Sequence, residues 1–289
     1  MQINFDLINS IRNNVKEYIV QNNIKSLIIG ISGGIDSTVN AAILKPICKE
    51  LNIPLIGRYI HIESNKKIEE ESARLVGKAF CTQFEVVDLT LPFNHFLTYS
   101  SSKNDDLNSI EFKIRKGNIK ARMRMMFLRD LTQKHKGLMV DNSNFTEYNL
   151  GFFTVSDNGD ISPMQLLWKT EVYEIAKLLA NNSNSEEKKA LEFSISLVPT
   201  DGLGISNSDL EQIGAKTYND VDDILQSFIQ FEEDNVKKML NEELADDLII
   251  KAFNDKCRIY TEDVVINVLK RWINSKYKRN NLPIVVNIN

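Results

Sequence analysis

A short apolar segment followed by a glycine turn constrains this chain more than any other feature. Residues 26–31 read SLIIGI, an apolar run typical of a buried strand, and residues 38–51 follow a helical pattern. Between them, residues 32–37 read SGGIDS. The two glycines allow a tight turn with exposed N–H groups, and the next helix presents its positive end to the same place. Strand, turn and helix together predict an anion-binding loop at the carboxyl edge of an open α/β sheet.

The loop also carries hydroxyl groups and one acidic residue. Ser32, Ser37 and Thr38 can donate hydrogen bonds to an anion. Asp36 would repel a phosphate unless a cation lies between them, and Mg²⁺ would remove that conflict. Neither a GxxxxGK[ST] pattern nor a GxGxxG pattern is present, so the loop is not of the Walker A or Rossmann type. The alternative is a plain glycine turn in which Asp36 and Ser37 cap the next helix.

The apolar pattern along the chain predicts an α/β architecture. A first amphipathic helix is expected around residues 8–19, and Pro46 predicts a kink or an early stop in the helix at 38–51. We expect further strands at 54–60, 83–89 and 137–140, helices at 66–80, 112–132, 169–179, 219–231 and 263–278, and polar loops at 100–108 and 181–187. Alternating strands and helices predict a doubly wound parallel sheet in residues 1–180, with a mostly helical extension in 181–289.

Composition excludes several classes of function. The net charge is −4 and the pI is about 5.6, so nothing in the charge balance favours a nucleic-acid partner. The apolar runs are short and no basic-then-apolar signal opens the chain, which argues against membrane insertion and secretion. Three dispersed cysteines argue against a disulfide framework. We therefore expect a cytoplasmic protein that binds neither nucleic acid nor membrane.

The loop resembles the SGGxDS signature of the PP-loop ATP pyrophosphatases, which cleave ATP between its α- and β-phosphates. Later segments are similar to motifs of one branch of that superfamily, the ammonia-dependent NAD⁺ synthetases. These segments are residues 117–125 (GNIKARMRM), Glu147 with 151–154 (GFFT), 160–163 (DISP), Lys169-Thr170, 199–203 (PTDGL), 212–215 (QIGA) and 275–283 (SKYKRNNLP). Their order along most of the chain is more specific than any single motif.

The resemblance implies a fold of the adenine nucleotide alpha hydrolase type, one domain spanning 1–289, and a homodimer. It implies that ATP is bound by Gly30, Ser32, Gly33, Gly34, Asp36, Ser37, Arg58, Asn142, Lys169 and Thr200. It implies three catalytic residues, Asp36, Glu147 and Lys169, of which Asp36 and Glu147 would hold Mg²⁺. It implies that deamido-NAD⁺ is bound by Arg122, Asp160, Tyr277 and Lys278.

The implied reaction needs no protein nucleophile. A carboxylate is a poor acyl donor, so attack on the α-phosphorus of ATP first converts it into a mixed anhydride and releases pyrophosphate. Ammonia then attacks the acyl carbon and AMP leaves. Positioning and charge neutralisation carry the rate. Because the loop lies close to Met1, we expect no fused glutaminase domain, and free or partner-delivered ammonia as the nitrogen source.

The chain departs from the family pattern in four places. Asp141-Asn142 stand where the family has Gly-Thr, and Val155 stands where it has lysine. The loop at 155–159 is shortened, and Tyr277 replaces a histidine. The last three changes fall on the side of the dinucleotide substrate, and the lost lysine removes a contact worth about 1.5–3 kcal/mol if charge-assisted.

Three alternatives therefore stand beside deamido-NAD⁺ amidation. The first is a PP-loop amide-forming ligase that acts on a different carboxylate. The second is an RNA-thiolating enzyme, which the lack of paired cysteines and of basic charge disfavours. The third is a nucleotide-binding relative that has lost catalysis.

Overall fold

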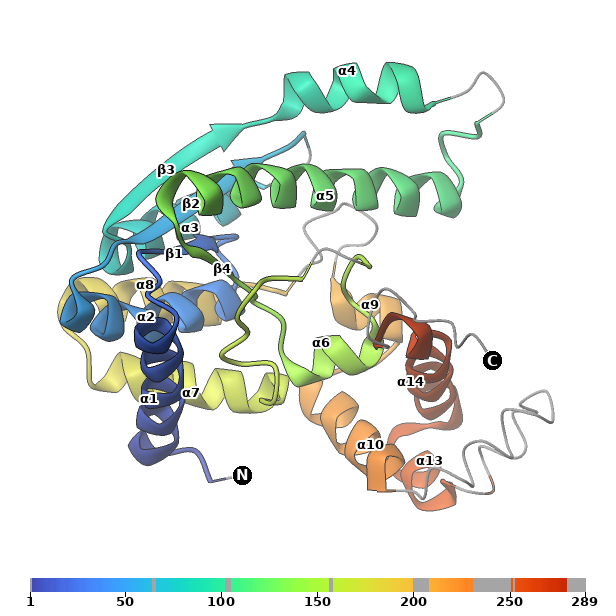
Figure 1. Ribbon diagram of the computed structural model, residues 1–289. Helices are drawn as coiled ribbons and strands as arrows, with labels where there is room; N and C mark the ends of the chain where they lie inside the picture. The colour runs from blue at the N-terminus through green and yellow to red at the C-terminus, as the bar shows by residue number, and fades with distance from the viewer. Residues whose placement is uncertain are drawn as a thin grey trace, which may run out of the picture.

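The computed structural model describes residues 2–63, 66–101, 105–155, 158–199, 208–230, 251 and 253–279 (Figure 1). The strands are β1 (Leu27–Gly30), β2 (Leu55–His61), β3 (Gln83–Asp88) and β4 (Leu138–Val140). The helices are α1 (Phe5–Gln21), α2 (Ile35–Leu51), α3 (Lys67–Phe80), α4 (Thr90–Ser100), α5 (Ile110–His135), α6 (Phe145–Leu150), α7 (Lys169–Asn181), α8 (Ser185–Ser196), α9 (Asp209–Ile213), α10 (Tyr218–Gln230), α13 (Asn254–Tyr260), α14 (Glu262–Asn274) and the 3₁₀ turn η1 (Lys276–Arg279).

The strands form one parallel sheet in the order β3-β2-β1-β4. In the register, Gly30 at the end of β1 lies beside Arg58 of β2, and Ile29 lies beside Val140, the last residue of β4. The carboxyl ends of β1, β2 and β4 therefore meet at one edge of the sheet, where the SGGIDS loop begins. This confirms the predicted parallel α/β sheet and places the loop where open α/β sheets bind ligands.

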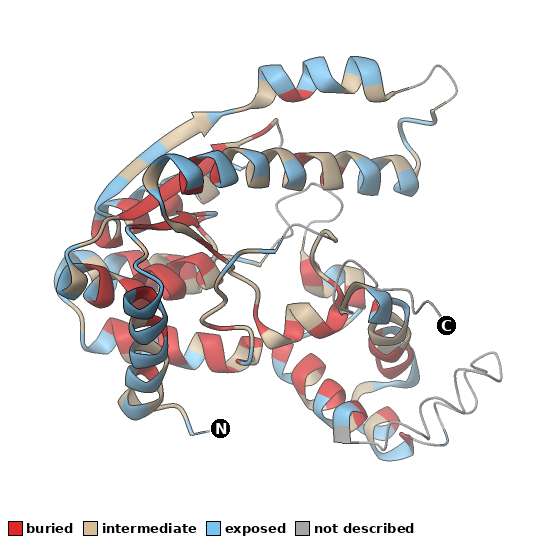
Figure 2. Cartoon of the chain, in the orientation of Figure 1, coloured by how far each residue is buried: buried red, intermediate tan, exposed pale blue. Residues whose placement is uncertain are grey.

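Helices cover both faces of the sheet, because alternate strand residues point to opposite sides. On one face, Leu27 and Ile29 pack with α1, α2, α3, α7 and α8 in a common core. On the other face, Ile28, Ile56 and Met139 pack against α4 and α5. Figure 2 shows buried residues on β1, β2 and β4 and on the inner sides of these helices, whereas β3 has none.

A separate apolar cluster joins the helices of the C-terminal part. It includes Leu150 of α6, Ile213 of α9, Phe228 of α10, Cys257 of α13 and Leu269 of α14. These helices lie together beside the α/β part in Figure 1. The predicted C-terminal helices are thus present, and α6 connects them directly to the end of β4. In the part of the chain that the structure describes, no helix has the length and apolarity needed to span a membrane.

Two local predictions need correction. Of the two effects predicted for Pro46, the early stop does not occur, because α2 continues to Leu51. A proline inside a helix costs about 3 kcal/mol, but the burial of Ile43, Leu44 and Ile47 around it is worth about 1.5–3 kcal/mol for each side chain. The polar loop expected at 181–187 also ends early. Helix α8 starts at Ser185, because the Asn184 side chain accepts hydrogen bonds from the N–H groups of Glu186 and Glu187.

Candidate functional site

The turn of the SGGIDS loop depends on Gly33. Its φ of 87° lies in the left-handed region, and a Cβ atom there would come within 2.3 Å of the Glu69 carbonyl oxygen. Ser72 of α3 donates a hydrogen bond from its hydroxyl to the Gly33 carbonyl at 2.7 Å. Helix α3 therefore packs directly on the turn and holds it in one conformation.

Hydroxyl groups order the rest of the loop. The Gly34 N–H donates to Ser32 Oγ at 3.2 Å, and the hydroxyls of Ser32 and Ser37 lie 3.2 Å apart. Gly34 is the N-cap of α2, and none of the described side chains caps this helix end. The first intrahelical bond recorded at this end runs from the Thr38 N–H to Gly34 O at 3.2 Å. The N–H groups of the first turn precede this bond, so the loop can accept an anion at the positive end of α2.

Three charged side chains from three helices meet beside the loop. Lys169, the first residue of α7, is only 2% exposed, and its ammonium group contacts Asp36 of α2 and Glu147 of α6. The Lys169 Nζ to Glu147 Oε1 distance is 2.9 Å. The three predicted catalytic residues are more than a hundred residues apart in sequence at their extremes, and the fold brings them into direct contact.

The electrostatics follow from this packing. Burial, followed by the negative charge of Asp36, raises the pKa of Glu147 to about 7. Burial alone would lower the pKa of Lys169, but the charges of Asp36 and Glu147 outweigh it and hold that pKa well above the usual value. One ammonium therefore pairs with two converging carboxylates, which leaves a net negative charge when both acids are ionised. A bound cation or polyanion would change this charge balance.

Asn144 is a site residue that the sequence analysis missed. Its amide nitrogen donates to Asp36 Oδ1 at 2.8 Å, and its amide oxygen accepts from the Glu147 N–H at 2.9 Å. It is fully buried and forms the N-cap of α6. The signal was present, because an Asn three residues before a Glu is a known start of a helix.

The amino end of α7 is held by α6 and α10. The Lys169 N–H donates to Thr146 Oγ1 at 2.8 Å, and the Thr170 N–H donates to Asp222 Oδ2 at 3.0 Å. Thr146 in turn donates its hydroxyl to Asp222. The Lys169 ammonium also lies 5.4 Å from the centre of the Tyr218 ring. The C-terminal helices thus fix the position of Lys169.

Comparison with known proteins shows the family to which the chain belongs. The family model for NAD synthase matches residues 7–280, nearly the whole chain. The chain belongs to the NAD synthase family. It is 33% identical over 216 residues to the NH(3)-dependent NAD(+) synthetase of Finegoldia magna, covering 74% of this chain and 80% of that protein. It is 30% identical over 271 residues to the protein of the same name from Pyrococcus furiosus, covering 93% of this chain and 90% of that one.

Solved structures show the same fold. An NMN synthetase from Francisella tularensis aligns with a TM-score of 0.73 at 20% identity, over 99% of this chain and 100% of that one. The NH3-dependent NAD synthetase from Campylobacter jejuni aligns with a TM-score of 0.66 at 20% identity, over 97% and 98%. The family model and the curated relatives thus confirm the resemblance to the NAD⁺ synthetases, and the solved structures show a common fold.

Two residues of this NAD synthase family member that are predicted to bind ATP form contacts inside the protein. Arg58 is buried, donates to the Gly57 carbonyl and pairs with Glu85 at 3.1 Å. Asn142 donates its amide to the Gly30 carbonyl at 2.8 Å. Asp141 Oδ1 accepts hydrogen bonds from the backbone and hydroxyl of Ser143, which turns the chain after β4. Thr200 lies outside the described residues.

The predicted acceptor-side residues are spread over three regions. Asp160 accepts from the Met139 N–H at 2.8 Å and pairs with Arg129 of α5. Lys278 in η1 donates to the carbonyls of Gly151 and Phe153 at 2.7 and 2.9 Å. The other two, Arg122 on α5 and Tyr277 on η1, are exposed. Asp160 and Lys278 are thus held by different parts of the chain, and the role of all four residues in binding stays a prediction.

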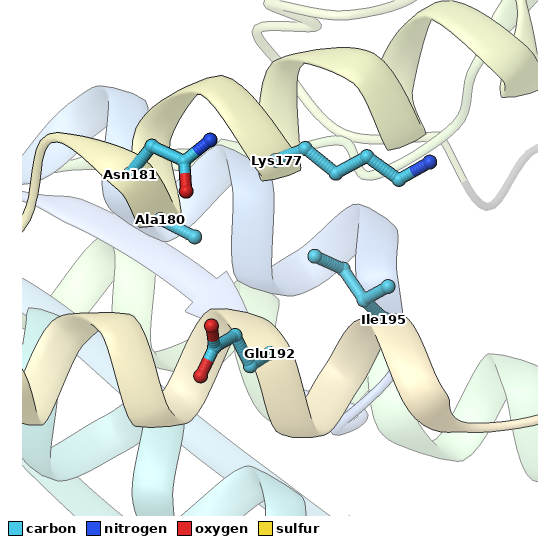
Figure 3. Close-up of a pocket in the computed structure, with 5 residues that line it drawn as sticks. All are labelled: Lys177, Ala180, Asn181, Glu192 and Ile195. Atoms are coloured by element: carbon cyan, nitrogen blue, oxygen red, sulfur yellow. The ribbon is translucent and has the colours of Figure 1, made fainter.

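Two further observations bear on ligands. No group of three or more His, Cys, Asp or Glu side chains among the described residues is arranged to hold a metal ion, and a role of Asp36 and Glu147 as metal ligands stays a prediction. A groove of about 300 Å³ lies between α7 and α8, lined by Lys177, Ala180, Asn181, Glu192 and Ile195 (Figure 3). None of these five residues belongs to the site described above.

Proposed function

We propose that this chain uses ATP to adenylate the carboxylate of deamido-NAD⁺ and transfers the acyl group to ammonia, giving NAD⁺, AMP and pyrophosphate. The observation that carries the proposal is the contact of Lys169 with Asp36 and Glu147 beside an uncapped phosphate loop. The names of the relatives supply the substrate class. The reaction joins two substrates through ATP and needs no nucleophilic side chain.

The residues have separate tasks in this scheme. The loop N–H groups and the hydroxyls of Ser32 and Ser37 hold the phosphates of ATP. An oxygen of the substrate carboxylate forms a bond to the α-phosphorus, and the bond from that phosphorus to the pyrophosphate oxygen breaks. The Lys169 ammonium stabilises the charge that develops on the departing pyrophosphate. The lone pair of ammonia then forms the amide bond, AMP leaves with its electron pair, and the nitrogen loses a proton to solvent.

The donor set beside the loop fits Mg²⁺. Two carboxylates converge on one position, and Mg²⁺ is usually bound by one or two carboxylates together with nucleotide phosphates and water. Burial, followed by the negative charge of Asp36, raises the pKa of Glu147, and a cation bound beside both carboxylates would favour their ionised forms. We propose Asp36 and Glu147 as the ligands. The bound ion would neutralise the phosphate oxygens of ATP.

The test is incubation of the purified chain with Mg-ATP, ammonium and deamido-NAD⁺, with NAD⁺, AMP and pyrophosphate measured together. Wild type should form the three products in equal amounts, and Asp36→Asn should lower the rate at least about 100-fold, since it removes a proposed ligand of the Mg²⁺ that neutralises the phosphates. Asp6→Asn is the matched control, an exposed acid in the first turn of α1. Consumption of ATP without NAD⁺ would reject deamido-NAD⁺ as the acceptor.

A smaller carboxylate acceptor is the second candidate. Val155 stands where the family has lysine, and Lys278 is already engaged with two backbone carbonyls, so fewer cations face a dinucleotide. The structurally similar NMN synthetase suggests that the mononucleotide acid is the compound to compare. The ratio of kcat/KM for nicotinate mononucleotide and deamido-NAD⁺ decides between them.

We also propose a homodimer, a cytoplasmic location and one functional unit spanning residues 1–289. In this scheme residues 1–180 bind the nucleotide, and residues 181–289 support it. The packing of α10 against α6 and α7 around Lys169 supports this division of tasks. Free ammonia is the proposed nitrogen source.

A further inference from the structure

Two asparagine side chains meet at the carboxyl end of β1, where the phosphate loop starts. Asn142 follows β4 and donates its amide to the carbonyl of Gly30 at 2.8 Å. Asn40 lies in α2, one turn beyond Asp36, and donates to Asn142 Oδ1 at 3.0 Å. The same amide of Asn40 donates to the Asp141 carbonyl at 3.0 Å. One pair of side chains therefore touches both the beginning of the loop and the helix that follows it.

Asn142 continues the β-ladder beyond the end of its strand. In a parallel pair, alternate carbonyls of one strand face the same neighbour. The Ser26 carbonyl faces β4 and accepts from the Leu138 N–H at 3.1 Å, so the Gly30 carbonyl, four residues later, points to the same side. β4 ends at Val140, which pairs with Ile29. The side-chain amide of Asn142 takes the place of the next backbone donor and fixes the last peptide before the loop.

Asn40 determines the orientation of this amide. It is fully buried, and rotating either amide by 180° would place oxygen against oxygen. The contacts with Asp141 O, Gly30 O and Asn142 Oδ1 thus allow one arrangement of the two groups. Because Asn40 is enclosed, it can influence a ligand only through Asn142 and the backbone it holds.

We propose that Asn40 and Asn142 form an amide latch that positions the phosphate loop for the triphosphate of ATP, and that Asn142 acts through the Gly30 carbonyl. The inference rests on the proposed function, since it assumes that the loop binds ATP. It changes the role that the family resemblance assigns to position 142, where a threonine hydroxyl would contact ATP directly. The latch joins both ends of the loop, so the directions of the loop N–H groups depend on it.

The two roles of Asn142 give opposite results for Asn142→Thr. This change restores the family residue, so it preserves or improves ATP binding if the side chain contacts the nucleotide. A threonine hydroxyl is one bond shorter than the asparagine amide and cannot maintain both contacts, so the latch predicts weaker binding. Asn40→Ala is the second variant. The side chain of Asn40 is enclosed and does not contact ATP, so this change can affect ATP binding only through Asn142 and the backbone. Asn182→Ala is the control, an exposed amide that donates to the Leu178 carbonyl at 2.9 Å.

The experiment measures the Kd of Mg²⁺ with α,β-methylene-ATP by calorimetry, and the KM for ATP and for the acceptor. Asn142→Thr and Asn40→Ala should each weaken nucleotide binding about tenfold, as expected for one or two net hydrogen bonds, with the acceptor KM unchanged. The double variant Asn40→Ala/Asn142→Thr should also lose about tenfold rather than a hundredfold, because the two groups act as a unit. The control should bind as wild type does.

Each outcome decides between the possibilities. Tight binding by Asn142→Thr, or additive losses in the double variant, would overturn the latch while leaving the proposed function intact. If wild type binds no nucleotide, the proposed function fails and the latch fails with it. A melting temperature recorded for each variant keeps unfolding apart from weakened binding, and Asn142→Thr at a half-buried position provides the result if Asn40→Ala does not fold.

Discussion

At the scale of single residues, the site depends on one ammonium group between two acids. Lys169 is almost fully buried and contacts Asp36 and Glu147, while Asn144 sets the distance between the helices that carry those acids. Unpaired charges are costly in such a place, so the three groups stabilise one another only as a set.

Removing the ammonium should therefore affect both activity and stability. Lys169→Met leaves two carboxylates facing each other, so we expect NAD⁺ formation to fall at least about 100-fold and the free energy of unfolding to fall by about 3 kcal/mol. Steady-state rates and urea unfolding measure the two effects. Lys177→Met, an exposed lysine on the same helix, is the control. A variant that keeps half of the wild-type rate would contradict the role of Lys169.

The turn of the loop offers a second residue-scale prediction. Gly33→Ala forces a Cβ into the Glu69 carbonyl in a left-handed conformation, so we expect a loss of about 1–3 kcal/mol in stability and no detectable ATP binding. Gly34→Ala is the matched change, because Gly34 has a φ of −75° and its Cβ would lie 3.4 Å from Ser32 Oγ. Thermal unfolding compares the two variants, and equal melting temperatures would refute the steric argument.

At the scale of elements, the segment between β4 and α7 organises the site. It begins with Asp141 and Asn142, which hold the loop, and continues into α6, which carries Glu147. Its end is fixed by α10, since Asp222 accepts from Thr146 of α6 and from the Thr170 N–H of α7. Three helices therefore share one buried carboxylate, and their relative positions depend on it.

This shared carboxylate predicts a specific dependence of stability on pH. Burial raises the pKa of Asp222 above its usual value, so the folded state holds the proton more tightly than the unfolded chain. Its contribution to stability is complete below the unfolded pKa of about 3.9 and is lost as the pH rises through the folded pKa. Asp222→Asn does not titrate, so its stability relative to wild type should increase with rising pH over this range. Urea unfolding at several pH values tests this, and parallel curves would contradict it.

At the scale of the whole molecule, α4 and α5 carry an exposed apolar surface. Leu91 and Tyr99 of α4 are 81% and 79% exposed, and Ile110, Ile114 and Met126 of α5 are also exposed. Both helices lie on the face of the sheet away from α2 and α7 in Figure 1. Exposed apolar side chains can form an interface between proteins, and we choose these residues to test the proposed homodimer.

This surface makes the dimer testable. Leu91→Asp combined with Tyr99→Asp should shift the protein from about twice the mass of the chain to the monomer, because charge would replace apolar contact. Light scattering coupled to size exclusion measures the mass. Val20→Asp on α1, another exposed apolar residue, should leave the mass unchanged. A wild-type monomer would reject the homodimer.

The sequence by itself determined the features that depend on residues close to one another in the chain. Strand, glycine turn and helix follow one another within a dozen residues, so the phosphate loop and the parallel sheet could be predicted from periodicity and from the conformation that glycine allows. The family motifs identified Asp36, Glu147 and Lys169 as members of one site. Helix α8 was not predicted. Its first residues are polar and resemble a loop, so the N-cap at Asn184 was not recognised.

Only the tertiary structure decided which groups meet. Asn144 donates to Asp36, which precedes it by 108 residues, and Asn40 donates to Asp141 and Asn142, which follow it by 101 and 102 residues. Pro46 stays in a helix because packing outweighs its local cost. Hydrogen bonds between distant segments have no periodic signal, since they require only that a donor and an acceptor come within about 3 Å after the core has formed.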